Sequence, residues 1–317
     1  MKKYVIPFLV FTFIVLAGCS VTEDKESDKP IIYTSIYPIQ YIVEQIAGDF
    51  VTVKSVYPPG VDAHTYEPAS KDITEIAKGD AFIYLGAGME SFAETTRDAL
   101  ESQDISFVEI GENEDIFMET EDHGHEHEDE DEHEEGHEHD HHHEGVDPHI
   151  WLDPLRMVEM GEIIKNELVE LYPEEKDYFN KNMDQLEKEL KTLDTAFHDT
   201  LDHKKNKSLL VTHAAYGYWE EKYGIEQISI NGLSSSDEPS QKELTNIAKI
   251  AKERELQYVI FDQAGSNRVS QIIQEHIGAE KRVIHNLEVL TEEDRKQKED
   301  YISLMEKNLQ ILDEATK

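Results

Sequence analysis

Histidine is concentrated in one stretch of this sequence, and imidazole is the side chain that most often binds transition metals. Ten of the sixteen histidines lie in "EDHGHEHEDEDEHEEGHEHDHHHEGVDPHIW", residues 121–151. A tight site for one ion needs a few ligands in fixed positions, and residues 123–143 offer almost nothing apolar to hold them. We therefore expect this run to collect several metal ions weakly. The alternative is an acidic loop whose metal affinity is incidental.

Three histidines outside residues 123–143, and one aspartate, come directly after, or in the loop that follows, short apolar runs typical of buried strands. His213 follows "LLVT" and Asp262 follows "YVIF"; His64 lies in "PPGVDAHTYEP" and His149 in "DPHIW". Ligands of parallel α/β sheets collect beyond the carboxyl ends of the strands, so these four side chains can converge. Three imidazoles and one carboxylate suit Zn²⁺ in a tetrahedral site, whereas manganese is expected to use more oxygen.

Each of these residues also has a purely structural interpretation. A single histidine at a strand end is commonly a hydrogen-bonded loop residue. Asp262 could instead cap a helix that begins near Ser266 or Asn267. The prediction of a metal site therefore depends on all four residues meeting.

The elements that must position these residues form two similar halves. Eight short runs rich in β-branched residues read as strands, and helix-like segments separate them; the runs are 31–38, 51–58, 81–88, 105–111, 208–215, 226–232, 256–263 and 281–290. Alternating strands and helices indicate parallel sheets covered by helices. The predicted fold is α/β with two βα lobes, each containing a four-stranded, mostly parallel sheet.

One long helix is expected between the halves. Apolar residues recur every three or four positions from Phe179 to Leu201, and Pro173 stands near the start. Such a stripe predicts a linking helix over residues 173–203. A coiled-coil dimer is the alternative, but the stripe is short and has predicted lobes at both ends, so we expect a monomer.

The N-terminus predicts export and lipid attachment. Lys2 and Lys3 precede an apolar run that ends in "LAGC", which resembles a bacterial lipoprotein signal with Cys19 as the lipidated residue. An ordinary cleaved signal peptide is the alternative. The expected organisation is a signal peptide (1–18), a lipidated tether (19–30), an N-terminal lobe (31–172) with a His- and acid-rich loop (119–145), the linking helix (173–203) and a C-terminal lobe (204–317).

Charge and cysteine content restrict the remaining possibilities. The formal net charge is −39, which argues against a nucleic acid as partner. Cys19 is the only cysteine, so an exported form cannot form an internal disulfide and must depend on its core.

At this point the chain resembles the metal-receptor lipoproteins of bacterial zinc and manganese ABC transporters, in particular the zinc-type high-affinity uptake members. The motifs are "YPPGVDAHTYEPASKDI", "IYLGAGMES", "DPHIWLDP", "VTHAAYGYW" and "VIFDQAGSNRVSQ", and the similarity extends from Ile31 to the C-terminus. The resemblance implies two lobes joined by one rigid helix. It implies a lipid-anchored receptor on the extracytoplasmic face of the membrane that captures Zn²⁺ between the lobes and delivers it to an ABC permease.

The resemblance also implies a ligand set. His64, His149 and His213 match family ligands, and manganese-type members have a carboxylate at the position of His213. Zinc-type members often have Glu where this chain has Asp262, so either Asp262 or a water molecule completes the shell.

Other classes of function fit less well. "HEEGH" and "HEHDH" match the H-E-x-x-H motif of metalloproteases, but they arise by composition in a run with no apolar face, so we expect no enzyme. A manganese receptor of the same family is the main alternative to zinc. A surface adhesion lipoprotein is a weaker one, because the sequence has no exposed aromatic repeat or binding module.

Overall fold

The computed structural model describes residues 29–119, 146–234, 239–263 and 268–317. The predictions for the signal peptide, for most of the tether including Cys19, and for the His-rich run of residues 123–143 lie outside these residues. The boundaries given above for the individual domains remain predictions.

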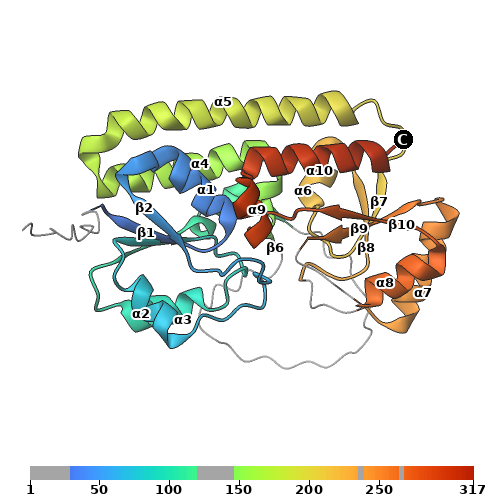
Figure 1. Cartoon of the computed structure of the whole chain (residues 1–317), viewed down its shortest axis with the longest axis horizontal. Helices are drawn as coiled ribbons and strands as arrows, with labels where there is room; N and C mark the ends of the chain where they lie inside the picture. The colour runs from blue at the N-terminus through green and yellow to red at the C-terminus, as the bar shows by residue number, and fades with distance from the viewer. Residues whose placement is uncertain (1–28, 120–145, 235–238, 264–267) are drawn as a thin grey trace, which may run out of the picture.

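Two four-stranded parallel sheets form the framework (Figure 1), which confirms the predicted fold class. The first sheet has the order β2-β1-β3-β4 and the second β10-β9-β7-β8, so both halves arrange their first four strands in the order second, first, third, fourth. The strands are β1 (Ile31–Thr34), β2 (Thr52–Ser55), β3 (Ala81–Tyr84), β4 (Ser106–Glu109), β7 (Ser208–Val211), β8 (Glu226–Ser229), β9 (Tyr258–Asp262) and β10 (Glu280–Ile284). Each lies within, or at most one residue outside, one of the eight predicted runs.

The helices cover these sheets and connect them. They are α1 (Tyr37–Ala47), α2 (Ser70–Ile76), α3 (Ala93–Leu100), α4 (Pro154–Leu171), α5 (Lys176–Leu201), α6 (Gly217–Tyr223), α7 (Gln241–Glu253), α8 (Arg268–Ile277), α9 (Glu292–Gln297) and α10 (Tyr301–Ala315), with 3-10 turns η1 (Gly48–Phe50), η2 (Ile110–Glu112), η3 (Glu114–Ile116), η4 (Ile150–Leu152) and η5 (Pro173–Glu175). Local sequence signals set several of their ends. The Asp153 carboxylate caps α4 by accepting the Leu155 N–H at 2.7 Å, and Pro154 fits the first helical position.

Helix α5 is the predicted linking helix. It has 26 residues, which is about 39 Å at 1.5 Å per residue, and Figure 1 shows it running above both sheets. Its apolar stripe is at most 3% exposed along its length, and α1, α4 and α10 pack against the helix. The stripe is therefore covered within one chain, as expected for a linking helix rather than for one strand of a coiled coil.

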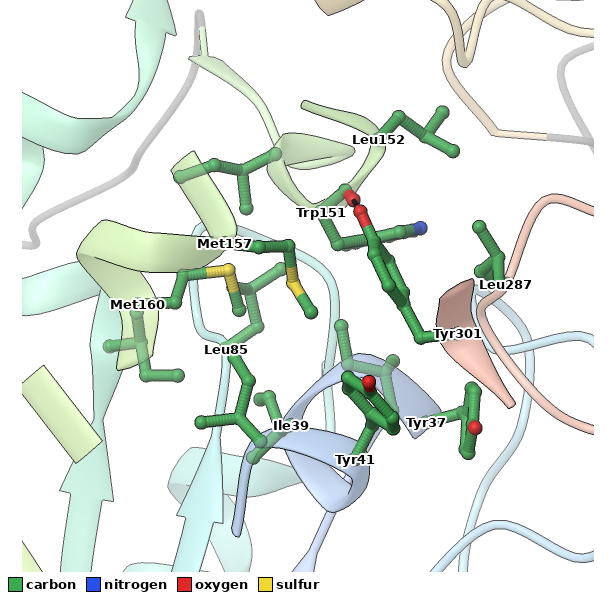
Figure 2. Packing of buried hydrophobic residues seen from close by; sticks show 14 of the residues in the cluster. Tyr37, Ile39, Tyr41, Leu85, Trp151, Leu152, Met157, Met160, Leu287 and Tyr301 are labelled. Carbon is green, nitrogen blue, oxygen red and sulfur yellow. Dashed lines mark hydrogen bonds between the residues drawn. The ribbon is translucent and has the colours of Figure 1, made fainter. Parts of the chain in front are cut away.

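One apolar core extends across both halves. Figure 2 shows a part of it, where Tyr37 and Tyr41 of α1 meet Trp151 and Tyr301. The Tyr301 hydroxyl donates to the Trp151 carbonyl at 2.7 Å, which joins the start of α10 to the segment before α4. A smaller, separate core lies in the second half under α7 and α8.

A short antiparallel ladder was not predicted. Strand β5 (Met118–Glu119) pairs with β6 (Val146–Asp147), so the chain on either side of residues 120–145 is held together at this point. Among the described residues, no helix is both long and apolar enough to cross a membrane.

Candidate metal centre

The predicted histidines come from loops at strand ends in both halves. His64 lies in the loop after β2, His149 between β6 and η4, and His213 two residues after β7. His64 and His149 are each preceded by an aspartate that accepts their backbone N–H. The His64 N–H donates to the Asp62 carboxylate at 3.0 Å, and the His149 N–H donates to the Asp147 carboxylate at 2.9 Å. This side-chain turn, common for Asp, fixes the backbone at each histidine.

The three imidazoles lie close together, and the carboxylate of Glu288 lies beside them. His64, His149, His213 and Glu288 each offer a ligand atom, and these four atoms all lie within 4.8 Å of one another. The Nε2 atoms of His64 and His149 are 3.3 Å apart. The Glu288 Oε1 atom is 3.5 Å from the Nε2 of His64, 3.8 Å from that of His149 and 4.0 Å from that of His213.

These separations suit a metal ion. Zinc bonds of 2.0–2.1 Å in a tetrahedron place the ligand atoms roughly 3.3 Å apart, so the observed cluster needs only a small contraction. The site is also shielded from water, because His149, His213 and Glu288 are at most 4% exposed. Within the described part of the chain, the buried His213 Nε2 and Glu288 Oε1 atoms have no hydrogen-bond partner. Burying polar atoms without partners is costly, and a bound cation would satisfy both.

Asp262 lies behind His213 rather than among the four clustered atoms. Its Oδ2 atom is 2.6 Å from the Nδ1 of His213, on the ring side opposite the Nε2 atom that faces the cluster. The Tyr216 hydroxyl donates to its Oδ1 at 2.6 Å, and the Thr212 hydroxyl donates to its Oδ2. Asp147 stands in the same relation to His149, with Oδ1 2.7 Å from Nδ1. Both carboxylates can therefore orient an imidazole so that its Nε2 faces a metal.

The sequence does not point to Glu288, because it predicts one strand over the run 281–290. Strand β10 ends at Ile284, and residues 285–290 form a loop at the carboxyl edge of the sheet. A ten-residue run is long for a strand, since five or six residues are usual, and this was the available signal. Backbone bonds hold the loop to the first half: the N–H groups of Tyr37 and Gly60 donate to the carbonyls of Glu288 and Leu290.

The surroundings shift the pKa values of the three imidazoles in different directions. Burial is the largest influence on each and disfavours its charged form. Burial prevails at His149, so the pKa of its imidazole lies below the usual value. At His64 the Glu288 carboxylate outweighs burial and raises the pKa of the imidazole. At His213 the Asp262 carboxylate, helped by Glu288, outweighs burial and raises the pKa to about 9. A metal ion must therefore displace a proton from the metal-free site.

The fold and the site together define a two-lobed α/β protein with a buried cluster of three imidazoles and one carboxylate that could hold a metal ion. The chain belongs to the family described as zinc-uptake complex component A, periplasmic, whose sequence model matches residues 32–315. This family is defined by a component of an uptake complex rather than by an enzyme activity.

Individual relatives agree with this assignment. The chain is 33% identical to the zinc-binding lipoprotein AdcA of Streptococcus pneumoniae R6, over all of this chain and 61% of that protein, so it spans about three fifths of that relative's length. It is 30% identical to the high-affinity zinc uptake system protein ZnuA of Bacillus subtilis 168, over 96% of this chain and 94% of that protein. The crystal structure of the Zn(II)-bound ZnuA-like domain of S. pneumoniae AdcA matches with a TM-score of 0.73 and 31% identity, over 91% of this chain and 99% of that one.

Proposed function

We propose that this protein is a high-affinity extracytoplasmic receptor that captures one Zn²⁺ ion between its two halves and delivers it to an ABC permease. The observation that carries the proposal is the group of four buried ligand atoms within 4.8 Å of one another. Family membership and the zinc-binding relatives support it. No catalytic role is assigned to any residue.

The ligands in this proposal are His64, His149, His213 and Glu288. Asp262, the fourth residue of the sequence prediction, instead accepts a hydrogen bond from the Nδ1–H of His213 in the metal-bound protein. That bond leaves Nε2 as the donor to zinc and strengthens it. The experiment is a zinc titration of His213→Ala, Glu288→Gln and Asp262→Asn in protein purified without added metal. A His213→Ala variant that still binds one zinc as tightly as the parent would overturn the proposal.

Zinc is favoured over manganese by the donor set. Three nitrogens and one oxygen in a small, buried, tetrahedral arrangement suit Zn²⁺, whereas Mn²⁺ prefers sites richer in oxygen and of higher coordination number. Competition between the two ions for metal-free protein tests this point. Displacement of bound zinc by equimolar manganese would favour the manganese receptor of the same family.

Attachment to the membrane is proposed to depend on lipidation of Cys19. The motivating features are "LAGC" and the polar segment that follows it. Acyl chains contribute about 0.8 kcal/mol per buried CH₂, so a multiply acylated terminus would keep the receptor beside its permease. Cys19→Ala should release the protein from washed membranes, and its retention there would argue against the anchor.

A further inference from the structure

Three consecutive residues at the start of α6 contact the two aspartates whose carboxylates orient the clustered histidines. They are Tyr216, Gly217 and Tyr218, and each is buried. None of them belongs to the cluster of four ligand atoms. Their contacts lie one step further out, on Asp262 in the second half and on Asp147 in the first.

Tyr216 contacts the aspartate of the second half, Asp262. Its side chain is 1% exposed, and its hydroxyl donates to the Asp262 Oδ1 atom at 2.6 Å. The other oxygen of that carboxylate lies 2.6 Å from the His213 Nδ1 atom. The tyrosine hydroxyl therefore fixes the rotation of the carboxylate whose second oxygen sets the plane of the His213 ring.

Tyr218 contacts the backbone of the first half, at Asp147 and Met118. Its hydroxyl donates to the Asp147 carbonyl at 2.7 Å and accepts the Met118 N–H at 3.1 Å, so one oxygen atom joins both strands of the β5–β6 ladder. The Arg156 guanidinium lies over the Tyr218 ring, 5.2 Å from its centroid. The backbone of Asp147, which leads directly to His149, is held from the second half of the molecule.

Gly217 lies against the side chain of the same aspartate. A Cβ atom at Gly217 would lie 2.5 Å from the Asp147 Oδ2 atom, closer than real Cβ contacts allow. The other oxygen, Oδ1, accepts the backbone N–H of His149 and lies 2.7 Å from its Nδ1 atom. Any side chain at residue 217 would therefore displace the carboxylate that orients His149.

We propose that Tyr216, Gly217 and Tyr218 are positioning residues that set the orientation of two zinc-binding imidazoles, one from each half, from a single helix start. This inference rests on the proposed zinc site. The three residues raise affinity by pre-organising the His149 and His213 rings, since rings already in place lose less conformational freedom on binding. Tyr216 contacts Asp262, whereas Gly217 and Tyr218 contact Asp147. Because these three residues are consecutive, the two halves present their imidazoles in a fixed mutual geometry.

The experiment compares Tyr216→Phe, Tyr218→Phe and Gly217→Ala with a matched control, Tyr223→Phe. Tyr223 lies on the same helix, is 1% exposed and also donates its hydroxyl to a carboxylate, Asp194 at 3.0 Å, away from the cluster. Zinc affinity is measured by competition with a chelator. The ring ¹⁵N signals of the histidines and the melting temperature are measured in metal-free protein.

Loss of a group that orients a zinc ligand commonly lowers affinity by 10–100-fold. Because the three residues act through Asp147 and Asp262 rather than on the imidazoles, we expect losses at or below the lower end of that range: about 10-fold for Gly217→Ala and about 3- to 10-fold for each site tyrosine. Tyr216→Phe should shift the ring signals of His213, whereas Tyr218→Phe and Gly217→Ala should shift those of His149. Tyr223→Phe should lower the melting temperature comparably and leave affinity and both rings unchanged.

Equal zinc affinity in the three site variants and the Tyr223→Phe control would overturn the inference. So would affinity losses that follow only the fall in melting temperature, with unchanged histidine signals. If Gly217→Ala does not fold, the two tyrosine variants still decide, because each removes a single oxygen atom. Failure of the proposed function is distinguishable: in that case the parent protein would bind no tight zinc, or His213→Ala would bind it equally well.

Discussion

Zinc affinity should depend steeply on pH because the metal-free site holds at least one proton that zinc must displace. The Asp262 carboxylate outweighs burial and raises the pKa of His213 to about 9, and Glu288 raises the pKa of His64. At pH 7 only about 1% of His213 would then be neutral, which weakens binding about 100-fold, or roughly 2.7 kcal/mol, relative to high pH. Affinity should rise about tenfold per pH unit from His213 alone and level off above pH 9.

The proton on His213 also affects the stability of the metal-free protein. Raising the pH should lower this stability, whereas it should raise the affinity for zinc. A histidine whose pKa is higher in the folded state than in the unfolded state stabilises the fold while it is charged. The contribution of His213 is therefore fully present below about pH 6.5, its ordinary value, and is lost as the pH rises through about 9. Raising the pH should weaken the metal-free fold and strengthen zinc binding at once.

Calorimetry in buffers of different ionisation enthalpy counts the protons released for each zinc bound. A chain lacking residues 123–143 should be used, so that the histidines of the run do not contribute. At pH 7 we expect about one proton from His213, with any contribution of His64 added to it. Asp262→Asn should reduce that number, because the largest effect that opposes burial at His213 is then lost and only weaker ones, such as that of Glu288, remain. Tight binding with no proton release and an unchanged affinity from pH 6 to 8 would refute this reasoning.

Three further outcomes are expected. Glu288→Gln should weaken zinc binding more than Asp262→Asn in chelator competition, since the first removes the anionic ligand and the second only an orienting group; the reverse order would restore Asp262 as the ligand. Leu190→Pro should destabilise α5 by roughly 3 kcal/mol or more and lower zinc affinity, and unchanged thermal unfolding would contradict its role. Deleting residues 123–143 should leave one tight zinc per chain and remove the additional weak equivalents in a titration; loss of the tight phase would make the run itself the site.

The framework could be predicted because its signals are local. Short runs rich in β-branched residues marked every strand of the two sheets, and the stripe from Phe179 to Leu201 marked α5. The rule that ligands gather at carboxyl edges was enough to select His64, His149 and His213, which the structure brings together.

The carboxylates could not be assigned in the same way. Asp262 does end a strand, but whether it faces a metal or the far side of His213 depends on the tertiary position of Tyr216 and Thr212. Glu288 was hidden because its loop continues the apolar composition of β10, and its place depends on contacts distant in sequence, among them those with Tyr37 and Gly60 of the other half.

The core that crosses both halves limits how this molecule can be divided. The two sheets repeat one strand order, which suggests two interchangeable modules. Yet Trp151 donates its indole N–H to the Asn286 carbonyl at 2.7 Å, and the Tyr301 hydroxyl donates to the backbone carbonyl of the same tryptophan. Cutting the chain between the halves would expose this aromatic surface to water on both fragments. The repeated architecture therefore does not provide two independently folding parts, and recombining either half with a foreign partner would require redesign of the shared core.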